Sequence, residues 1–331
     1  MHSVRDLSLF LCAAAGFCLM SAAVHKAAPL NVAEVTPKLA HLRAHATDYD
    51  TLFIGSSRVY HGLQPRVFDA EMAAAGKPSH SFNLGIDGMA PRESLELARL
   101  AATVPMPRLR RVFIEIGQAA RVPDSDPPTV RNIYWQNGHA LVAGLRYVWR
   151  DYWTPPADLK GRAWLEAGRA FALFARNQFN IGRFAPVPAI GKPRRKEPDS
   201  VMLGPNGDGY MPVFRNISPS DVDRMHGEMR QIESGATPPR PSDPLTQHDF
   251  AEVAQLFASR GVRVYLLATP IQPRGFDVVL QAPEGVPLLE FQDWRRHPEF
   301  YQPDHRCDSA HLNDSGAAIF SRELADACPG D

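Results

Sequence analysis

Residues 51–57 read Thr51-Leu52-Phe53-Ile54-Gly55-Ser56-Ser57, a short apolar run followed by a glycine and two hydroxyl residues. Such a run is typical of a buried strand in a parallel sheet, because strands of these sheets are covered on both faces. The glycine lets the chain turn sharply directly after the strand. We therefore expect a serine hydroxyl to be presented at the carboxyl end of this strand.

The same pattern recurs along the chain, with amphipathic helices between the apolar runs. Strand, helix and strand in succession predict a doubly wound α/β fold, flavodoxin-like, with a mainly parallel sheet sandwiched by helices. In such sheets ligands bind beyond the carboxyl ends of the strands. The further expected strands are 81–84, 111–116 and 262–268, and the expected helices are 65–75, 91–102, 250–260 and 316–327.

The amino terminus is apolar and uncharged from Leu7 to Val24. This run is long for a signal-peptide core and just long enough for a spanning helix, which needs roughly 17–25 residues. We expect residues 1–26 to be an uncleaved anchor in the inner membrane, with the rest of the chain on the periplasmic side. Ser21-Ala22-Ala23 would also suit a signal peptidase, so a secreted soluble form is the alternative. Residues 27–49 are expected to form a stalk or first helix.

The composition limits both the domain count and the class of partner. A chain of 331 residues that is 44% hydrophobic can bury one large core. Lys plus Arg and Asp plus Glu both total 36, so no net charge attracts nucleic acid, which is not expected as a partner. Many of the 30 prolines fall between residues 122 and 245. We expect residues 50–331 to form one domain with a helical insertion at about 125–245, in which 164–179 form a helix.

Two cysteines lie outside the apolar amino-terminal segment, Cys307 and Cys328. They could form one disulfide in an oxidising compartment. Two reduced thiols are an equally good prediction, because the sequence does not give the distance between them.

Near the carboxyl terminus, Asp308-Ser-Ala-His311 supplies a carboxylate and an imidazole three residues apart. On a turn or helix start this spacing places both side chains on one side, so the carboxylate can accept a hydrogen bond from one ring nitrogen. Ser57 adds a hydroxyl, which makes a nucleophile, a base and an orienting group available. Each motif alone has another reading: Gly-Ser-Ser is often a tight turn, and Asp-x-x-His is often a cap beside a surface histidine.

These stretches together resemble the SGNH, or GDSL-like, hydrolase superfamily, especially exported members associated with O-acylation of cell-surface polysaccharides. The similarity covers about residues 50–124 and 246–328. Gly55-Ser56-Ser57 is similar to the family's Gly-Asp-Ser block, and residues 308–313 are similar to its closing Asp-x-x-His-Leu-Asn block. The resemblance implies that Ser57 is the nucleophile, His311 the base and Asp308 the residue that orients the base.

The resemblance also implies an oxyanion hole. Residues 83–88, Asn-Leu-Gly-Ile-Asp-Gly, resemble the family segment whose last glycine donates its N–H to the oxyanion, which assigns that role to Gly88 together with the Ser57 N–H. The family often has Gly-x-Asn-Asp in a third block, where this chain reads Gly117-Gln-Ala-Ala. Gln118 is the candidate to replace the missing asparagine. Arg58 and His61 are candidate substrate contacts, although a solvated helix start explains them equally well.

By resemblance we expect a serine esterase or O-acyltransferase that moves acetyl groups on an exported glycan or small ester, without a metal ion or organic cofactor. The alternative is a catalytically silent protein of this fold that binds a glycan or partners a membrane-bound O-acyltransferase. The missing asparagine favours the silent protein slightly. The presence of Ser57, Asp308 and His311 favours the enzyme more.

Overall fold

A computed structural model describes residues 2–27, 32–117, 130–153, 160–179, 199–235, 240–273 and 278–328. The chain divides into two compact units. Met1–Val32 and Arg121–Lys196 form the first unit, and Ala33–Ala120 and Glu197–Asp331 form the second. The part of the expected insertion that follows Lys196 therefore belongs to the second unit, which carries the sheet.

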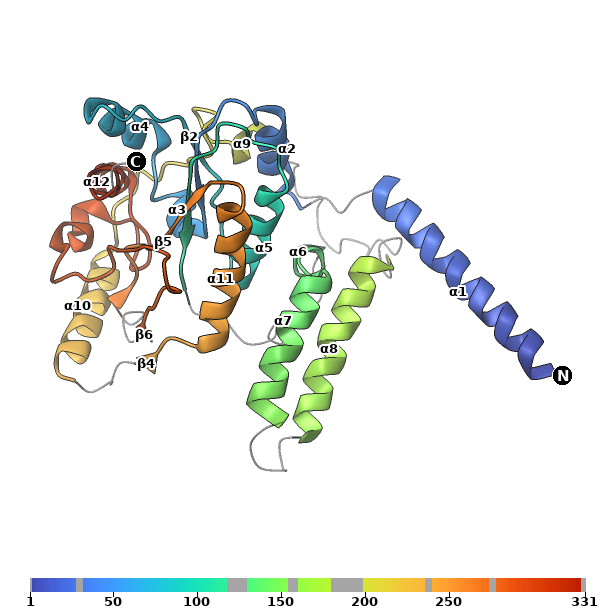
Figure 1. The fold of residues 1–331 in the computed structure, drawn as a ribbon. Coiled ribbons are helices and arrows are strands. Elements are labelled where there is room, and N and C mark those ends of the chain that lie inside the picture. Colours follow the sequence, from blue (N-terminus) through green and yellow to red (C-terminus); the bar gives the residue numbers. More distant parts are fainter. Residues whose placement is uncertain are drawn as a thin grey trace, which may run out of the picture. The chain divides into compact units, whose positions relative to one another are not determined.

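The second unit is built on a five-stranded sheet in which every strand pairs in parallel (Figure 1). The spatial order is β2-β1-β3-β5-β7. Its first four strands along the chain agree with the predicted apolar runs, which confirms the α/β class, whereas the last strand was not predicted. The strands are β1 (Thr51–Ile54), β2 (Ser81–Asn83), β3 (Arg111–Glu115), β5 (Arg263–Ala268) and β7 (Leu288–Glu290).

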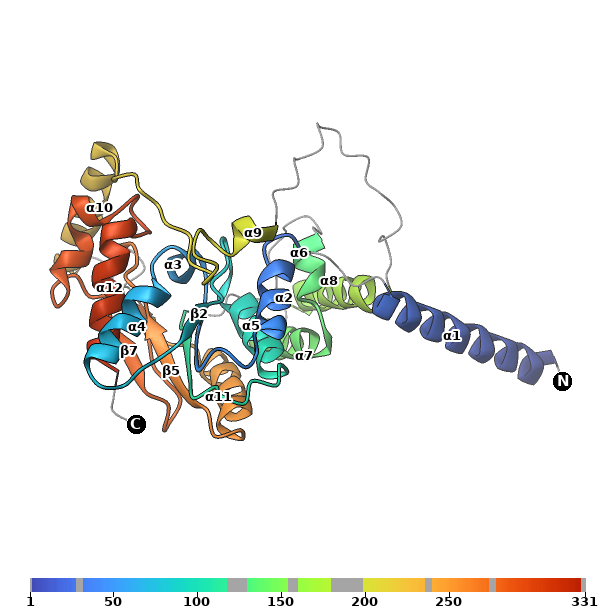
Figure 2. The ribbon, with the colours of Figure 1, turned by 90° about the horizontal axis from the view of Figure 1, so that it is seen from above.

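Helices cover both faces of this sheet (Figure 2). Helices α4 (Pro65–Ala74) and α12 (Asp314–Asp326) pack together on one face, and α5 (Pro91–Ala102) and α11 (Pro244–Ala258) pack together on the other. Much of the core under α4 and α12 is aromatic. Alternate residues of a strand point to the same face, so the aromatic residues of neighbouring strands meet there. This core includes Phe53, Phe68, Phe113, Tyr265, Phe300 and Phe320.

The helices begin and end at residues with clear physical roles. Pro91 occupies the first turn of α5, where its missing N–H has no cost. The Asn313 side chain caps α12 by accepting a hydrogen bond from the Gly316 N–H at 3.0 Å. Gly261 follows α11 with φ of 75°, a conformation that strains residues with a side chain.

Residues 27–49 were expected to form a stalk or a first helix of the globular part. The structure contains helix α2 (Thr36–Ala44) in this range, as part of the second unit. Four of its side chains are buried, including that of Lys38. The first-helix interpretation therefore applies to residues 36–44. The remaining elements of this unit are α3 (Ser57–Tyr60), α9 (Asp199–Met202), α10 (Pro219–Glu233), the parallel pair β4 (Arg240–Pro241) and β6 (Val278–Val279), and the 3-10 helices Pro298–Tyr301 and Pro303–His305.

The first unit contains α1 (His2–Ala27) and a set of shorter helices. Residues 5–25 of α1 have a mean hydropathy of 2.2, and the helix is long and apolar enough to cross a membrane or to serve as a signal segment. Within this unit the Ser21 hydroxyl donates to the Gln178 carbonyl at 3.0 Å. The other helices are α6 (Val130–Tyr134), α7 (Gly138–Val148), the π-helical turn Trp149–Trp153 and α8 (Lys160–Gln178), which contains most of the predicted helix 164–179.

A pair of carboxyl groups makes the stability of the second unit depend on pH. Partial burial and a hydrogen bond with Glu299 raise the pKa of Glu323 to about 7. Because this pKa is raised, its contribution to stability is present at acid pH and is lost as the pH rises through about 7. Glu323→Gln stays neutral, so we expect its Tm at pH 8 to exceed that of the wild type by roughly 2–4 °C.

The Tm of both proteins should be measured by calorimetry between pH 5 and pH 8. The exposed Glu290 offers the control, and Glu290→Gln should follow the wild-type curve at every pH. A Glu323→Gln protein with the same pH dependence as the wild type would show that the carboxyl pair does not contribute.

Candidate active site

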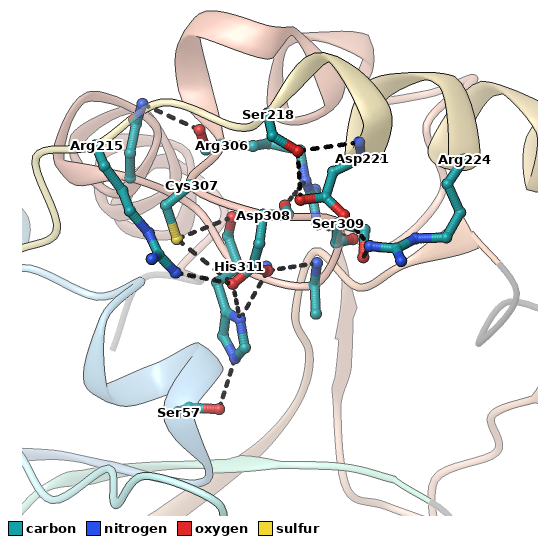
Figure 3. A network of polar contacts seen from close by, with 12 residues as sticks. Ser57, Arg215, Ser218, Asp221, Arg224, Arg306, Cys307, Asp308, Ser309 and His311 are labelled. Atoms are coloured by element: carbon teal, nitrogen blue, oxygen red, sulfur yellow. Dashed lines mark hydrogen bonds and ion pairs between the residues drawn. The ribbon is translucent and has the colours of Figure 1, made fainter.

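Ser57, His311 and Asp308 lie in hydrogen-bonding contact (Figure 3). The Ser57 Oγ is 2.7 Å from His311 Nε2, and His311 Nδ1 is 2.9 and 3.0 Å from the two carboxylate oxygens of Asp308. Because the carboxylate can only accept, His311 Nδ1 carries the proton and Nε2 is the acceptor for the serine hydroxyl. The structure thus brings together the three residues predicted to form a triad.

Backbone N–H groups hold the Asp308 carboxylate in place. Its Oδ1 accepts from the N–H of Ala310 at 2.8 Å and from that of His311 at 2.9 Å. Partial burial acts to raise the pKa of Asp308, but the hydrogen bonds from the His311 ring and the Ala310 N–H outweigh it and hold the pKa well below its usual range. The ionised carboxylate can therefore offset a positive charge on His311.

The turn that carries Ser57 requires the glycine before it. Ser57 is the first residue of α3, directly after the turn that ends β1. A Cβ built on Gly55 would lie 2.4 Å from a Val59 methyl and 2.6 Å from the Glu115 carboxylate. A side chain at position 55 would therefore force Val59 and Glu115, or the turn itself, to move.

Glu115 supports this turn from the neighbouring strand. Its carboxylate, at the end of β3, accepts from the Ser56 N–H at 2.5 Å, Arg58 Nε at 2.6 Å and the Thr269 hydroxyl at 3.0 Å. Burial acts to raise the pKa of Glu115, but Arg58 and the Ser56 N–H outweigh it and lower the pKa. Glu115 was predicted only as part of a strand, although a carboxylate at the end of a buried strand itself indicates a paired charge.

Arg58 is one of the two predicted substrate contacts, and substrate contact by Arg58 stays a prediction. Its side chain is paired with Glu115 and is 22% exposed, so it braces the residues on either side of Ser57. His61, the second predicted contact, lies beside the triad, with its ring centroid 6.4 Å from that of His311. His61 Nδ1 donates to the Met211 carbonyl at 2.8 Å, and burial lowers the pKa of His61. Substrate contact by His61 stays a prediction.

Arg306 holds the turn that carries Asp308 and His311. Its side chain is fully buried and donates to the carbonyls of Phe300 at 3.0 Å, Asp308 at 3.2 Å and Ser309 at 2.8 Å. These hydrogen bonds fix the backbone on both sides of Asp308. This role was not predicted, because the three carbonyls belong to an irregular loop whose conformation around Arg306 has no simple sequence pattern.

Asn83 fastens the segment after β2 to the helix that begins with Ser57. Its amide nitrogen donates to the carbonyls of Val59 and Leu63 at 2.7 Å each, and its oxygen accepts from the Gly85 N–H at 2.8 Å. A Cβ on Gly85 would lie 2.4 Å from the Tyr60 backbone nitrogen, so only glycine permits this approach.

Lys38 of α2 also holds the segment after β2 in place. Its ammonium donates to the carbonyls of Asn83 at 3.1 Å, Gly85 at 2.6 Å and Gly209 at 2.7 Å. Burial holds the pKa of Lys38 well below its usual range, although the charge of Asp208 acts in the opposite direction.

The structure describes two of the three predicted oxyanion donors, Ser57 and Gly88. Gly88 lies in the exposed turn after β2, the neighbour of β1, and has φ of 63°, which favours glycine. The Ser57 N–H is at the amino end of α3, where helical N–H groups have no partner within the helix. Gln118 lies outside the described residues. The oxyanion roles of Ser57 and Gly88 stay predictions.

Cys307 and Cys328 are both buried and form no disulfide with each other. The Cys307 Sγ lies 3.7 Å from the His311 carbonyl oxygen, whereas Cys328 packs in the apolar cluster around Phe320. Of the two alternatives left open by the sequence, the structure contains the reduced thiols and not the bridge.

One group of side chains in the described part of the chain has the geometry to hold a metal ion. The ligand atoms of His297, Glu299 and Glu323 lie within 4.8 Å of one another, between the 3-10 helix Pro298–Tyr301 and α12. His297 Nδ1 already makes a hydrogen bond of 3.1 Å with Glu323. None of these residues belongs to the triad.

The triad geometry is what nucleophilic catalysis at a carbonyl requires, because a serine hydroxyl needs an adjacent base and the base needs an orienting group. The structure supplies all three in contact, at the carboxyl edge of a parallel sheet where ligands of such folds bind. Comparisons of the chain with family models, with curated proteins and with solved structures found no match.

Proposed function

We propose that the protein is an SGNH-type serine enzyme that hydrolyses or transfers acyl groups, with acetyl as the expected group, on an exported glycan or small ester. The unbroken hydrogen-bonded chain from Ser57 through His311 to Asp308 carries the proposal. The order of the motifs supports it, because the serine follows the first strand and the Asp/His pair precedes the last helix, as in the family that the sequence resembles.

In the proposed mechanism His311 Nε2 takes the proton of Ser57 while the serine oxygen attacks the acyl carbonyl carbon. Asp308 stabilises the imidazolium that forms, and the N–H groups of Ser57 and Gly88 stabilise the oxyanion. His311 then gives its proton to the leaving oxygen, and an acyl ester of Ser57 remains. Water or a sugar hydroxyl, deprotonated by His311, attacks this ester, and His311 returns the proton to the departing Ser57 oxygen, which yields the free acid or the acylated sugar.

The amino-terminal helix supports an exported location for this chemistry. An anchored α1 would hold the second unit on the periplasmic side of the inner membrane, close to a membrane-bound O-acyltransferase that could supply acyl groups. Cleavage of α1 as a signal segment would instead give a secreted enzyme. Competition between water and a polymer hydroxyl for the acyl-enzyme decides between hydrolase and transferase.

A catalytically silent protein of the same fold is the second candidate. The sequence Gly117-Gln-Ala-Ala favours it, because the family's asparagine at this place donates to the oxyanion. Removal of one such donor costs about 2.7–4 kcal/mol of transition-state stabilisation in comparable hydrolases. A silent protein would bind a glycan or an acyltransferase partner without forming an acyl-enzyme.

Fluorophosphonate labelling followed by peptide mapping tests the proposal. We expect one phosphonate on the peptide that contains Ser57 in the folded, full-length protein, and none in Ser57→Ala. Ser56→Ala is the matched control and should still be labelled, because its hydroxyl is not bonded to His311. Equal labelling of wild type and Ser57→Ala would contradict the nucleophile assignment, and a folded wild-type protein without label would favour the silent candidate.

A further inference from the structure

Residues 211–217 form a loop that is held against the segment that carries Ser57. The Met211 N–H donates to the Tyr60 carbonyl at 3.1 Å, and the Met211 carbonyl accepts from His61 Nδ1 at 2.8 Å. Tyr60 ends the short helix that Ser57 begins. The start of the loop is therefore fixed relative to the nucleophile.

The same loop is held against the segment that carries Asp308 and His311. The Asp314 N–H donates to the Val213 carbonyl at 2.9 Å, and the Ile217 N–H donates to the Arg306 carbonyl at 2.8 Å. The Asn313 amide also donates to the side-chain oxygen of Asn216 at 3.0 Å. The loop thus bridges the two halves of the triad, and hydrogen bonds near both of its ends hold its backbone.

Two large side chains at the tip of this loop point into solvent. The Phe214 side chain is 79% exposed, so its ring contributes little to the core. The Arg215 side chain is 71% exposed, and its Nη2 lies 3.8 Å from Asp308 Oδ2 (Figure 3). An exposed aromatic ring and a guanidinium therefore belong to adjacent residues of a loop that is held against both halves of the triad, and the guanidinium reaches the Asp308 carboxylate.

This pair has the chemistry of a recognition site. An exposed ring on an ordered backbone can stack on the apolar face of a sugar at little entropic cost, because few of its torsions remain to be fixed. Arg215 offers a planar set of donors that matches a carboxylate. Asp308 and Cys307 use only part of this donor set, because Arg215 meets Asp308 at 3.8 Å, beyond hydrogen-bond distance, and otherwise interacts with the Cys307 thiol.

We propose that Phe214 and Arg215 form a subsite for an acidic glycan, in which Phe214 stacks on a sugar ring and Arg215 binds the carboxylate of that sugar or of its neighbour. The subsite rests on the proposed function and deepens it, because it names a carboxylate-bearing polysaccharide as the substrate that presents a hydroxyl or an ester to Ser57. A neutral glycan would use the ring but not the charge.

Binding of defined oligosaccharides to the full-length Ser57→Ala protein in detergent tests the subsite without any catalytic step. The probes are tetragalacturonate and the same tetrasaccharide after reduction of its carboxyl groups, measured by calorimetry at low salt. We expect Arg215→Gln to raise the Kd for tetragalacturonate about tenfold and to leave the reduced sugar almost unaffected. Phe214→Ala should raise the Kd for both sugars by about tenfold, and Phe214→Tyr should restore the binding.

Arg296→Gln is the matched control for charge, because the Arg296 side chain is 66% exposed and lies 3.9 Å from Glu290. It should bind both sugars as the parent protein does. Failure of the parent protein to bind tetragalacturonate, or equal weakening by Arg296→Gln and Arg215→Gln, would overturn the subsite. Equal affinity for the acidic and the reduced sugar would overturn its acidic specificity.

These outcomes are separate from the test of the proposed function, which uses wild-type protein and a fluorophosphonate. Labelling of Ser57 without sugar binding would remove the subsite and leave the enzyme. Sugar binding that depends on Phe214 and Arg215, without labelling of Ser57, would leave the subsite and remove the enzyme.

Discussion

Replacement of Asp308 by asparagine is expected to slow turnover of 4-nitrophenyl acetate roughly ten-thousandfold, as the corresponding change does in serine proteases. The amide has no charge to stabilise the imidazolium. In addition, its nitrogen would take the place of Oδ2, which is 3.0 Å from His311 Nδ1, and would donate to that ring nitrogen. The proton of the neutral ring would then lie on Nε2, where it blocks acceptance of the Ser57 proton.

The asparagine oxygen can still accept the hydrogen bonds from the Ala310 and His311 N–H groups, so we expect the variant to fold. The rate of 4-nitrophenol release should be measured, and circular dichroism should confirm the fold. Asp304→Asn removes an exposed carboxylate from the same segment and should stay within about twofold of the wild type. A folded Asp308→Asn protein with more than a tenth of wild-type turnover would remove Asp308 from the mechanism.

Replacement of Glu115 by alanine is expected to lower the free energy of unfolding by about 3 kcal/mol. The change leaves Arg58 without its carboxylate and removes the acceptor for the Ser56 N–H and the Thr269 hydroxyl. Glu115→Gln should cost less, because its amide oxygen can still accept from the Ser56 N–H. Urea denaturation of the three proteins gives the comparison.

The exposed pair of Glu290 and Arg296 provides the control for this measurement, since Glu290→Ala also breaks an ion pair of the same unit. Its cost should stay below about 1 kcal/mol, because water screens exposed pairs. The labelling rate of Glu115→Ala should also fall, since the turn that carries Ser57 loses its support. Equal unfolding free energies for Glu115→Ala and wild type would contradict the role given to Glu115.

The parallel sheet was largely predictable from the sequence, because its central strands are continuous apolar runs that end in glycine or polar residues. β7 is no shorter than β2, but it was missed because no amphipathic helix pattern leads into it and no glycine turn follows it. α10 was missed for another reason. Its Pro219 was counted with the chain breaks, whereas proline in the first turn of a helix is favourable.

For the candidate site, local spacing predicted the pairing of Asp308 with His311, and the strand end predicted the position of Ser57. The supporting charges were not predictable in this way. Glu115 and Lys38 are satisfied by groups that lie far away in sequence, and Arg306 by carbonyls of an irregular loop that folds around it, so their burial becomes understandable only when those partners are seen. For Lys38 and Arg306 no single-sequence pattern distinguishes the buried charge from a solvated one, whereas the place of Glu115 at the end of an apolar strand is such a signal.

The three carbonyl bonds of Lys38 also determine where the second unit can be cut from the rest of the chain. A fragment that starts at β1 would lack Lys38 and would leave the carbonyl oxygens of Asn83, Gly85 and Gly209 without this donor. Asn83 and Gly85 belong to the segment that leads to Gly88. The shortest piece that retains these bonds must include α2, and the second unit begins at Ala33. Proteolysis on the amino-terminal side of Ala33 would therefore cut the apolar helix from the second unit and keep the Lys38 hydrogen bonds, whereas cleavage after α2 would also cut Lys38 from the unit.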